Sequence, residues 1–178
     1  MFIPSHIRLA SRVIRGSEVD VGYIGKGLFC IGSIIPDFVL IRPQHQVQLT
    51  ACKIDKRLSN IEYVYHNRLL RLFLLGIVYH YICDYFCRPH NDATILHGMK
   101  HHRYEFRLMR LIKYFQDLNL DTDSIKLSEY YNYLILKHAE YIDGLVNVEC
   151  FTMDDVNYAL NMGVVLLLAS QDIVSKRG

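Results

Sequence analysis

The sequence predicts an all-α protein, organised as a single compact domain of several helices over residues 1–178. Apolar residues recur every three or four positions through most of the chain, which is the helical period. No stretch alternates apolar and polar residues with period two for long enough to predict a sheet. No internal repeat, low-complexity tract or linker divides the chain, and 178 residues are enough to bury one sizeable core.

The first part of the chain predicts one helix and then a loosened segment. The helix covers residues 5–15, with Ser5 available as its N-cap. Three glycines loosen the chain before the apolar segment 28–40. They are Gly22, Gly25 and Gly27. Within the apolar segment, Pro36 predicts a break and places Asp37 at a turn.

The middle of the chain predicts three helices, over residues 47–59, 66–88 and 99–117. The second of these is expected to stop at Pro89. The third has a stripe of side chains at helical spacing, which consists of Glu105, Leu108, Ile112 and Phe115. We expect the second and third helices to pack side by side at the centre of the domain.

The last part of the chain predicts two more helices. Residues 124–142 form a Tyr-rich amphipathic pattern. The final helix starts at about residue 153, with Thr152 as its cap and Asp155 near the end of the helix dipole that favours a negative charge.

Charge and cysteine content restrict the partners and the location of the protein. The formal net charge is +2, and Lys and Arg are scattered along the chain, so we expect no patch for nucleic acid or for an anionic membrane. Five cysteines without framework spacing suit a reducing compartment. The N-terminus lacks the apolar core of a secretory signal, and the apolar run 163–169 is too short to span a bilayer. We expect a soluble cytoplasmic protein.

Asp84 requires a partner, because it lies in the apolar segment 72–87. A carboxylate in such surroundings is costly unless another group neutralises it. His80 lies four residues earlier, so the two side chains share one face of the expected helix. That face is otherwise apolar and includes Phe73, Ile77 and Cys87, which directs the pair toward the core.

A second pair repeats this spacing on the next helix. His101 and Glu105 are four residues apart, and His90 follows the proline break between the two helices. Six of the nine histidines fall between residues 66 and 102, so the two pairs and His90 are not treated as separate chance events. Facing helices in bundles gather His and carboxylate ligands in this way, so the pattern predicts a metal site.

Other interpretations of these side chains stay open. A single helical His and Asp pair is more often a hydrogen-bonded core or surface pair than a metal site. His97 also lies four residues before His101 and is an alternative ligand to it. Cys83 and Cys87 are more simply explained as small buried thiols than as ligands of a soft metal. Surface positions, or positions around the site, are expected for the three remaining histidines, His66, His102 and His138.

The order of these residues resembles a known family. His80, Asp84, a histidine six residues later at His90, and then His101 with Glu105 look like the motif of the zinc-dependent phospholipase C family. The all-helical fold of that family is shared with the single-strand-specific zinc nucleases.

The resemblance extends toward the N-terminus and covers about residues 4–110. The segment 32–37 matches a Gly-x-x-x-Pro-Asp turn of the family, while His6 and His45 match by their order the histidines before and after it. Glu105 favours the phospholipase side, because the nucleases usually have Asp at that position.

The resemblance implies eight protein ligands for two or three zinc ions. They divide into Asp37, His45 and His80 for one ion, His90, His101 and Glu105 for a second, and Asp84, bridging from the first ion, with His6 for a third. Three protein ligands per zinc leave an open position, which is the catalytic arrangement. In the secreted bacterial enzymes the processed N-terminal residue completes the third set, and the absence of a signal here makes two ions as compatible with the sequence as three.

The resemblance and the ligand set together predict a zinc-dependent hydrolase of phosphate esters that uses metal-activated water, similar to phospholipase C. Asp37 or Asp84 is expected to orient that water or to take its proton, and the sequence does not separate these roles. The alternatives are a zinc-dependent nuclease or phosphodiesterase, and a helical protein that binds metal without catalysis. The near-neutral charge disfavours the nuclease.

Overall fold

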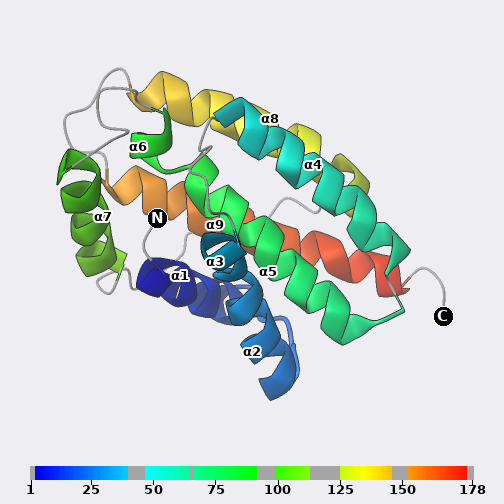
Figure 1. The fold of residues 1–178 in the computed structure, drawn as a ribbon. Helices are drawn as coiled ribbons and strands as arrows, with labels where there is room; N and C mark the ends of the chain where they lie inside the picture. Colours follow the sequence, from blue (N-terminus) through cyan, green and yellow to red (C-terminus); the bar gives the residue numbers. More distant parts are fainter. Residues whose placement is uncertain are drawn as a thin grey trace.

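A computed structural model describes residues 3–39, 47–64, 66–91, 99–112, 125–145 and 152–175. Within these ranges the regular structure is helical and includes no strand, so the all-α prediction is confirmed. The helices, shown in Figure 1, are α1 (Ile3–Gly16), α2 (Gly22–Gly32), α3 (Ile35–Val39), α4 (Val47–Tyr63), α5 (Arg68–Tyr85), α6 (Arg88–Asn91), α7 (Met99–Ile112), α8 (Leu127–Leu145) and α9 (Thr152–Ser175).

Helix α5 lies at the centre of the arrangement. Thirteen of its eighteen residues are buried, so it is covered on nearly all sides. It packs against α1, α2, α4 and α9, and Figure 1 shows it passing between these helices. The side chain of Asn67 caps its first turn by accepting a hydrogen bond from the backbone N–H of Leu70 at 2.9 Å. Because α5 is surrounded by other helices, its sequence is apolar almost throughout.

The contact between α2 and α5 depends on two glycines. Gly32 of α2 faces Gly76 of α5, and a Cβ added to Gly32 would lie 3.1 Å from the Cα of Gly76 and overlap a backbone oxygen. The helices therefore meet backbone to backbone. The expectation that Gly22, Gly25 and Gly27 loosen the chain was wrong, because this packing keeps α2 helical in spite of its glycines.

The end of α5 differs from its predicted position at Pro89. The helix ends at Tyr85, and residues 88–91 form the separate short helix α6, with Pro89 in its first turn where proline needs no backbone donor. The backbone N–H of Arg88 donates to a carboxylate oxygen of Asp155 in α9 at 2.9 Å. A side chain from a distant helix therefore satisfies the first N–H of α6.

Helix α7 lies at one end of the molecule rather than alongside α5. It packs against α1 and α9, so the expectation that the two helices run side by side at the centre was wrong (Figure 1). Its inner face matches the predicted stripe at Glu105, Leu108 and Ile112, all of which are buried. Phe115, the last member of that stripe, lies outside the described residues.

Two of the predicted helix caps are wrong. Ser5 lies inside α1, which starts two residues earlier, and its buried hydroxyl has no hydrogen-bond partner among the described residues. Thr152 is the first residue of α9 itself. Helix α8 is displaced from the predicted range 124–142 and covers Leu127–Leu145.

The four cysteines in the described residues, Cys30, Cys52, Cys83 and Cys87, are free thiols. Among the described helices, none has both the length and the apolar content that crossing a membrane requires. The cytoplasmic location stays a prediction.

Candidate metal centre

Three buried side chains from two helices form the first cluster, which we define as His6, His80 and Asp84. Their ligand-type atoms all lie within 4.8 Å of one another. The Nε2 atoms of His6 and His80 lie 3.7 and 3.4 Å from the two carboxylate oxygens of Asp84. The two imidazole rings are stacked, with centroids 4.2 Å apart. Helix α5 supplies the pair at i and i+4, while α1 brings His6 against it from the other side.

Asp37 lies beside this cluster. Pro36 in the first turn of α3 starts a new helix after the turn at Ser33 and Ile34, as the break predicted there requires. The Asp37 oxygens lie 4.0 Å from Nε2 of His6 and 3.8 Å from Nε2 of His80. Burial raises the pKa of Asp37, although 23 % of its side chain stays accessible. Two imidazoles and two carboxylates therefore converge on one small space.

A backbone contact fixes the orientation of His80. Its Nδ1 lies 3.0 Å from the carbonyl oxygen of Ser33. A carbonyl oxygen only accepts, so Nδ1 is the atom that donates its hydrogen. In the neutral ring the lone pair is then on Nε2, which is the atom that faces Asp37 and Asp84. Metal-binding histidines are commonly held by such a bond on the far nitrogen.

His6 is buried without the hydrogen bonds that a buried imidazole normally makes. It is 0 % exposed, and neither ring nitrogen has a hydrogen-bond partner among the described residues. Burial and the neighbouring His80 lower the pKa of His6 well below its usual value. The ring is therefore neutral, which is the form that binds a metal ion.

The second cluster consists of His90, His101 and Glu105, whose ligand-type atoms also lie within 4.8 Å of one another. Helix α6 supplies His90, and α7 supplies the pair at i and i+4. Nε2 of His101 lies 3.0 Å from Oε1 of Glu105. Burial opposes ionisation of Glu105, but the hydrogen bond from His101 and nearby positive charge lower the pKa of Glu105 to about 2. This carboxylate is ionised at neutral pH.

Asp84 joins the two clusters. Its Oδ1 lies 3.7 Å from Nε2 of His90, the same distance at which it lies from Nε2 of His6. Burial alone would raise the pKa of Asp84, but surrounding positive groups, including His90 and His80, hold this pKa well below its usual value. An ionised carboxylate with 4 % exposure thus lies between three imidazole rings.

The donor set fits zinc. Neutral imidazole nitrogens and carboxylate oxygens are the ligands that zinc takes at catalytic sites. Neither His6 nitrogen has a hydrogen-bond partner among the described residues, and the contact with Ser33 leaves Nε2 of His80 available, so both rings could bind a shared cation. Ionised carboxylates in both clusters would repel unless cations lay between them.

Two residues of the sequence prediction cannot be placed. His45, expected beside Asp37 and His80, lies outside the described residues, and so does His97, the alternative to His101. Of the eight expected ligands, the other seven lie in the two clusters or, for Asp37, next to the first.

Sequence reasoning placed Asp155 in the first turn of the last helix but missed its role as a buried carboxylate that supports the second cluster. Asp155 of α9 is 0 % exposed and accepts three hydrogen bonds. Besides the Arg88 N–H, the hydroxyls of Tyr104 and Tyr141 donate to it at 2.6 and 2.7 Å. Arg88 lies two residues before His90, and Tyr104 directly precedes Glu105. The carboxylate therefore fixes both chain segments that bear the second cluster.

A further contact under the same cluster involves His138. Nε2 of His138 lies 3.0 Å from Oδ1 of Asn91, whose amide donates to the carbonyl oxygens of Tyr85 and Cys87. The His138 ring also stacks on Tyr85, with centroids 3.7 Å apart. His138 is therefore a buried support of α6, whereas His66 and His102 are exposed.

Cys83 and Cys87 lie inside the core and not in either cluster. Burial raises the pKa of both thiols, which keeps them protonated at neutral pH. This agrees with their interpretation as small buried thiols.

The fold and the clusters together define a class of protein, an all-helical protein with buried histidine and carboxylate clusters that could hold metal ions. The sequence model of one family, described as zinc dependent phospholipase C, matches residues 5–151. The chain belongs to the zinc-dependent phospholipase C family. The match continues about forty residues beyond the motif region that carries the resemblance in the sequence. No curated protein and no solved structure matches the chain significantly.

Proposed function

We propose that this protein is a zinc-dependent phosphoric ester hydrolase of the phospholipase C type, with a phospholipid as its substrate. The observation that supports this most is the position of Asp84. Its carboxylate lies 3.4–3.7 Å from imidazole nitrogens of α1, α5 and α6, in a chain that belongs to the zinc-dependent phospholipase C family.

The proposed ligands follow the two clusters. His90, His101 and Glu105 would hold one zinc ion. His80 and Asp37, together with His45, would hold another, and Asp84 lies where it can serve both. His6 would share a third ion with Asp84. The geometry supports this assignment, because Asp84 has an oxygen toward each of the three histidines around it.

Bound zinc ions lower the pKa of coordinated water and withdraw charge from a phosphoryl oxygen. The chain supplies the remaining functions. We assign proton acceptance to Asp37, because its side chain is 23 % exposed whereas that of Asp84 is 5 % exposed. Asp37, beside the first cluster, is thus the carboxylate that substrate and water would reach. Asp84 stays ionised and orients His6, His80 and His90 around it.

A substrate panel with three arms tests the proposal. The purified protein is incubated with bis-p-nitrophenyl phosphate, short-chain phosphatidylcholine or single-stranded DNA, each with zinc or with a chelator. We expect zinc-dependent hydrolysis of phosphatidylcholine and slower hydrolysis of the chromogenic diester. Cleavage of DNA alone would assign the protein to the nuclease side of the fold. No turnover in any arm, with zinc bound in stoichiometric amounts, would show a metal-binding protein without this activity.

Asp37→Asn is the matched test of the proton acceptor. The amide keeps the shape of the side chain but accepts no proton, so we expect kcat to fall about 100-fold or more. Zinc content is measured in parallel, because Asp37 is also a proposed ligand. A fall in kcat with zinc retained would support proton acceptance, whereas loss of zinc would attribute the fall to the ligand role.

A further inference from the structure

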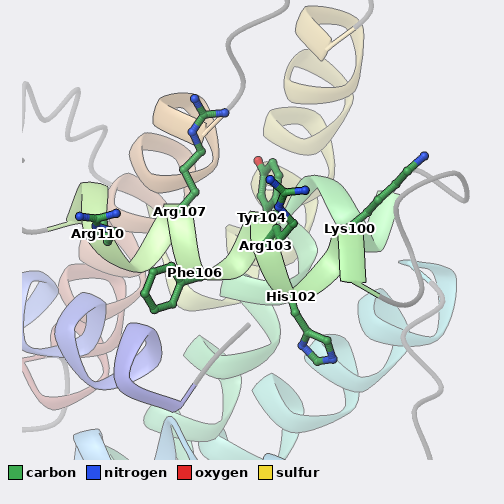
Figure 2. A pocket seen from close by; sticks show the side chains of 7 residues that line it. All are labelled: Lys100, His102, Arg103, Tyr104, Phe106, Arg107 and Arg110. Carbon is green, nitrogen blue, oxygen red and sulfur yellow. The ribbon is translucent and has the colours of Figure 1, made fainter.

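The outer face of α7 has a dense group of basic side chains. Together with His102, Tyr104 and Phe106 they line an open pocket of about 890 Å³. The basic residues are Lys100, Arg103, Arg107 and Arg110, all exposed. Figure 2 shows Lys100, Arg103 and Arg107 projecting from the same side of the helix, with Arg110 at its far end.

The spacing of the four cations places them on one stripe. At about 100° per residue, Lys100, Arg103, Arg107 and Arg110 fall within an arc of about 80°. Glu105, Leu108 and Ile112 fall on the opposite side of the helix, where they are buried. The sequence expectation that Lys and Arg are scattered was therefore wrong for this helix, because positions that are spread along the sequence coincide on one face.

No acidic side chain of α7 balances this face. Glu105 is the single carboxylate in residues 99–112, and it is buried against His101. None of the four cations forms an ion pair with any residue that the structure describes. For comparison, the net charge of the whole chain is only +2. The face has the positive potential that an anionic partner requires.

We propose that this basic face of α7 docks the protein onto an anionic phospholipid bilayer. The proposal rests on the function proposed above and adds the surface through which the enzyme reaches its lipid. The four cations extend over about 15 Å of helix, at 1.5 Å per residue. A single phosphate needs donors that converge on one point, whereas a row of this length matches an extended anionic surface.

Apolar side chains along the edge of the stripe favour a bilayer over nucleic acid. Met99 is 83 % exposed and Phe106 is 52 % exposed, and both fall next to the basic arc. The guanidinium of Arg110 lies 6.0 Å from the centre of the Phe106 ring. An exposed apolar edge beside a basic stripe is the pattern of a helix that lies in the lipid interface.

The opposite face of the same helix places the metal centre close to the proposed surface. His101 and Glu105 of the second cluster point inward from α7. A helix with its side chains is about 10–12 Å across, so docking through α7 brings the second cluster within about that distance of the headgroups.

The test compares binding of the full-length protein to vesicles of pure phosphatidylcholine and to vesicles with 30 mol % phosphatidylserine, by sedimentation at low temperature. We expect binding to the anionic vesicles only, weakened in 0.5 M NaCl. The variant Lys100→Gln/Arg103→Gln/Arg107→Gln should bind about 100-fold more weakly, because each basic residue near such a surface contributes about fivefold.

A matched variant controls for the loss of three charges. Arg15→Gln/Lys26→Gln/Lys56→Gln removes three exposed cations from α1, α2 and α4. We expect this variant to keep vesicle binding within about threefold of the wild type, since electrostatic attraction to a membrane falls off within a Debye length. Equal losses in both triple variants would overturn the proposal, and so would unchanged binding of the α7 variant.

Two further outcomes separate this proposal from the proposed activity. Vesicle binding through α7 without hydrolysis of any diester would support the surface and contradict the enzyme. Hydrolysis of bis-p-nitrophenyl phosphate without vesicle binding would support the enzyme activity and contradict the membrane surface. Binding of DNA in place of anionic vesicles, lost in the α7 variant, would show that the basic face serves nucleic acid and would overturn the membrane assignment.

Discussion

Asp84 is the residue on which the candidate centre depends. One carboxylate faces His6, His80 and His90, which come from three different helices. An ionised carboxylate at this depth is costly unless neighbouring groups or a bound cation neutralise it. Because Asp84 faces both clusters, its removal affects both at once.

We predict that Asp84→Asn lowers zinc content and activity together. The amide keeps the volume of the side chain but loses the charge that a shared cation needs. We expect at least one zinc equivalent to be lost and hydrolysis to fall by about 100-fold or more. Metal analysis and the diester assay measure these effects. Asp143→Asn, at an exposed position of α8, is the control and should retain both zinc and rate. Unchanged zinc in Asp84→Asn would show that another group neutralises Asp84.

A second residue-scale prediction concerns Asp155 and pH. Burial raises the pKa of Asp155 to about 6, despite the three hydrogen bonds that favour its ionised form. Its value in the unfolded chain is about 3.9, so the folded state binds this proton more tightly. The stabilisation is complete below about pH 4 and is lost as the pH rises through about 6. Two pKa units correspond to about 3 kcal/mol.

The comparison that isolates this effect is between the wild type and Asp155→Asn, which does not titrate. Denaturant unfolding at pH 4, 5, 6 and 7 should show the wild type losing unfolding free energy relative to the variant as pH rises. A difference between the two proteins that does not change across this range would contradict the raised pKa.

Local spacing revealed part of the site, and tertiary contacts determined the rest. His80 and Asp84 could be paired from the sequence, because residues four apart share a helix face. His6 has no such relation to them and could be placed only through the resemblance. The supporting role of Asp155 was missed, because its hydrogen-bond partners lie 14, 51 and 67 residues away along the chain. No local pattern marks a contact of that kind.

At the scale of elements, the contact between α2 and α5 determines where His80 lies relative to α3. We predict that Gly76→Ala destabilises the protein by about 3 kcal/mol. The added Cβ would overlap the carbonyl oxygen of Phe29, which is backbone and cannot turn aside, and would lie 3.0 Å from Gly32 Cα. Because the two helices must separate, we also expect weaker zinc binding.

Gly27→Ala is the matched control for this change. Gly27 lies within α2, and a Cβ added there meets nothing within 4 Å. Since alanine favours the helical state more than glycine does, the unfolding free energy should stay the same or rise by up to about 1 kcal/mol. Denaturant unfolding of both variants distinguishes a steric effect from a general sensitivity of α2.

The bracing of α6 and α7 by α9 gives another prediction at this scale. Asp155→Ala leaves the donors of Arg88, Tyr104 and Tyr141 without their acceptor, at a cost of about 3 kcal/mol or more. We expect zinc affinity to fall about tenfold for the second cluster. Asp154→Ala is the control, because Asp154 is exposed in the same first turn of α9 and should matter little. Equal losses of stability and zinc affinity in the two variants would indicate that Asp155 acts through the helix dipole and not through its three hydrogen bonds.

Periodicity identified most helices but not how they pack. The stripe on residues 99–112 is regular, so the helix was expected, and its buried face was assigned correctly at Glu105 and Leu108. The same periodicity contains no information about the neighbour that covers the stripe. That neighbour is α1 together with α9, not α5. The helical state of α2 was missed for the same reason, because the backbone contact of Gly32 with α5 cannot be read from periodicity.

At the scale of the whole molecule, the candidate ligands come from α1, α3, α5, α6 and α7, so metal binding and folding are coupled. We predict that chelation lowers the melting temperature by about 5–10 °C. Zinc at 100 times its Kd adds about 2.7 kcal/mol, and 1 kcal/mol corresponds to about 2–4 °C in a protein of this size. Zinc-saturated chelator is the control, and added zinc should restore the original value. An unchanged melting temperature would contradict the coupling.

The hydrogen bonds to Asp155 also impose an order on events during synthesis. A chain emerges from the ribosome N-terminus first. The first cluster, whose last residue is Asp84, can therefore assemble while later helices are still being made. Asp155 is synthesised after Arg88, Tyr104 and Tyr141, so the three donors have no acceptor until Asp155 has been made. The segments that carry the second cluster therefore gain these hydrogen bonds only once translation has passed Asp155. A nascent chain stalled at residue 151 would lack this brace and would expose to chaperones the apolar surface that α9 covers.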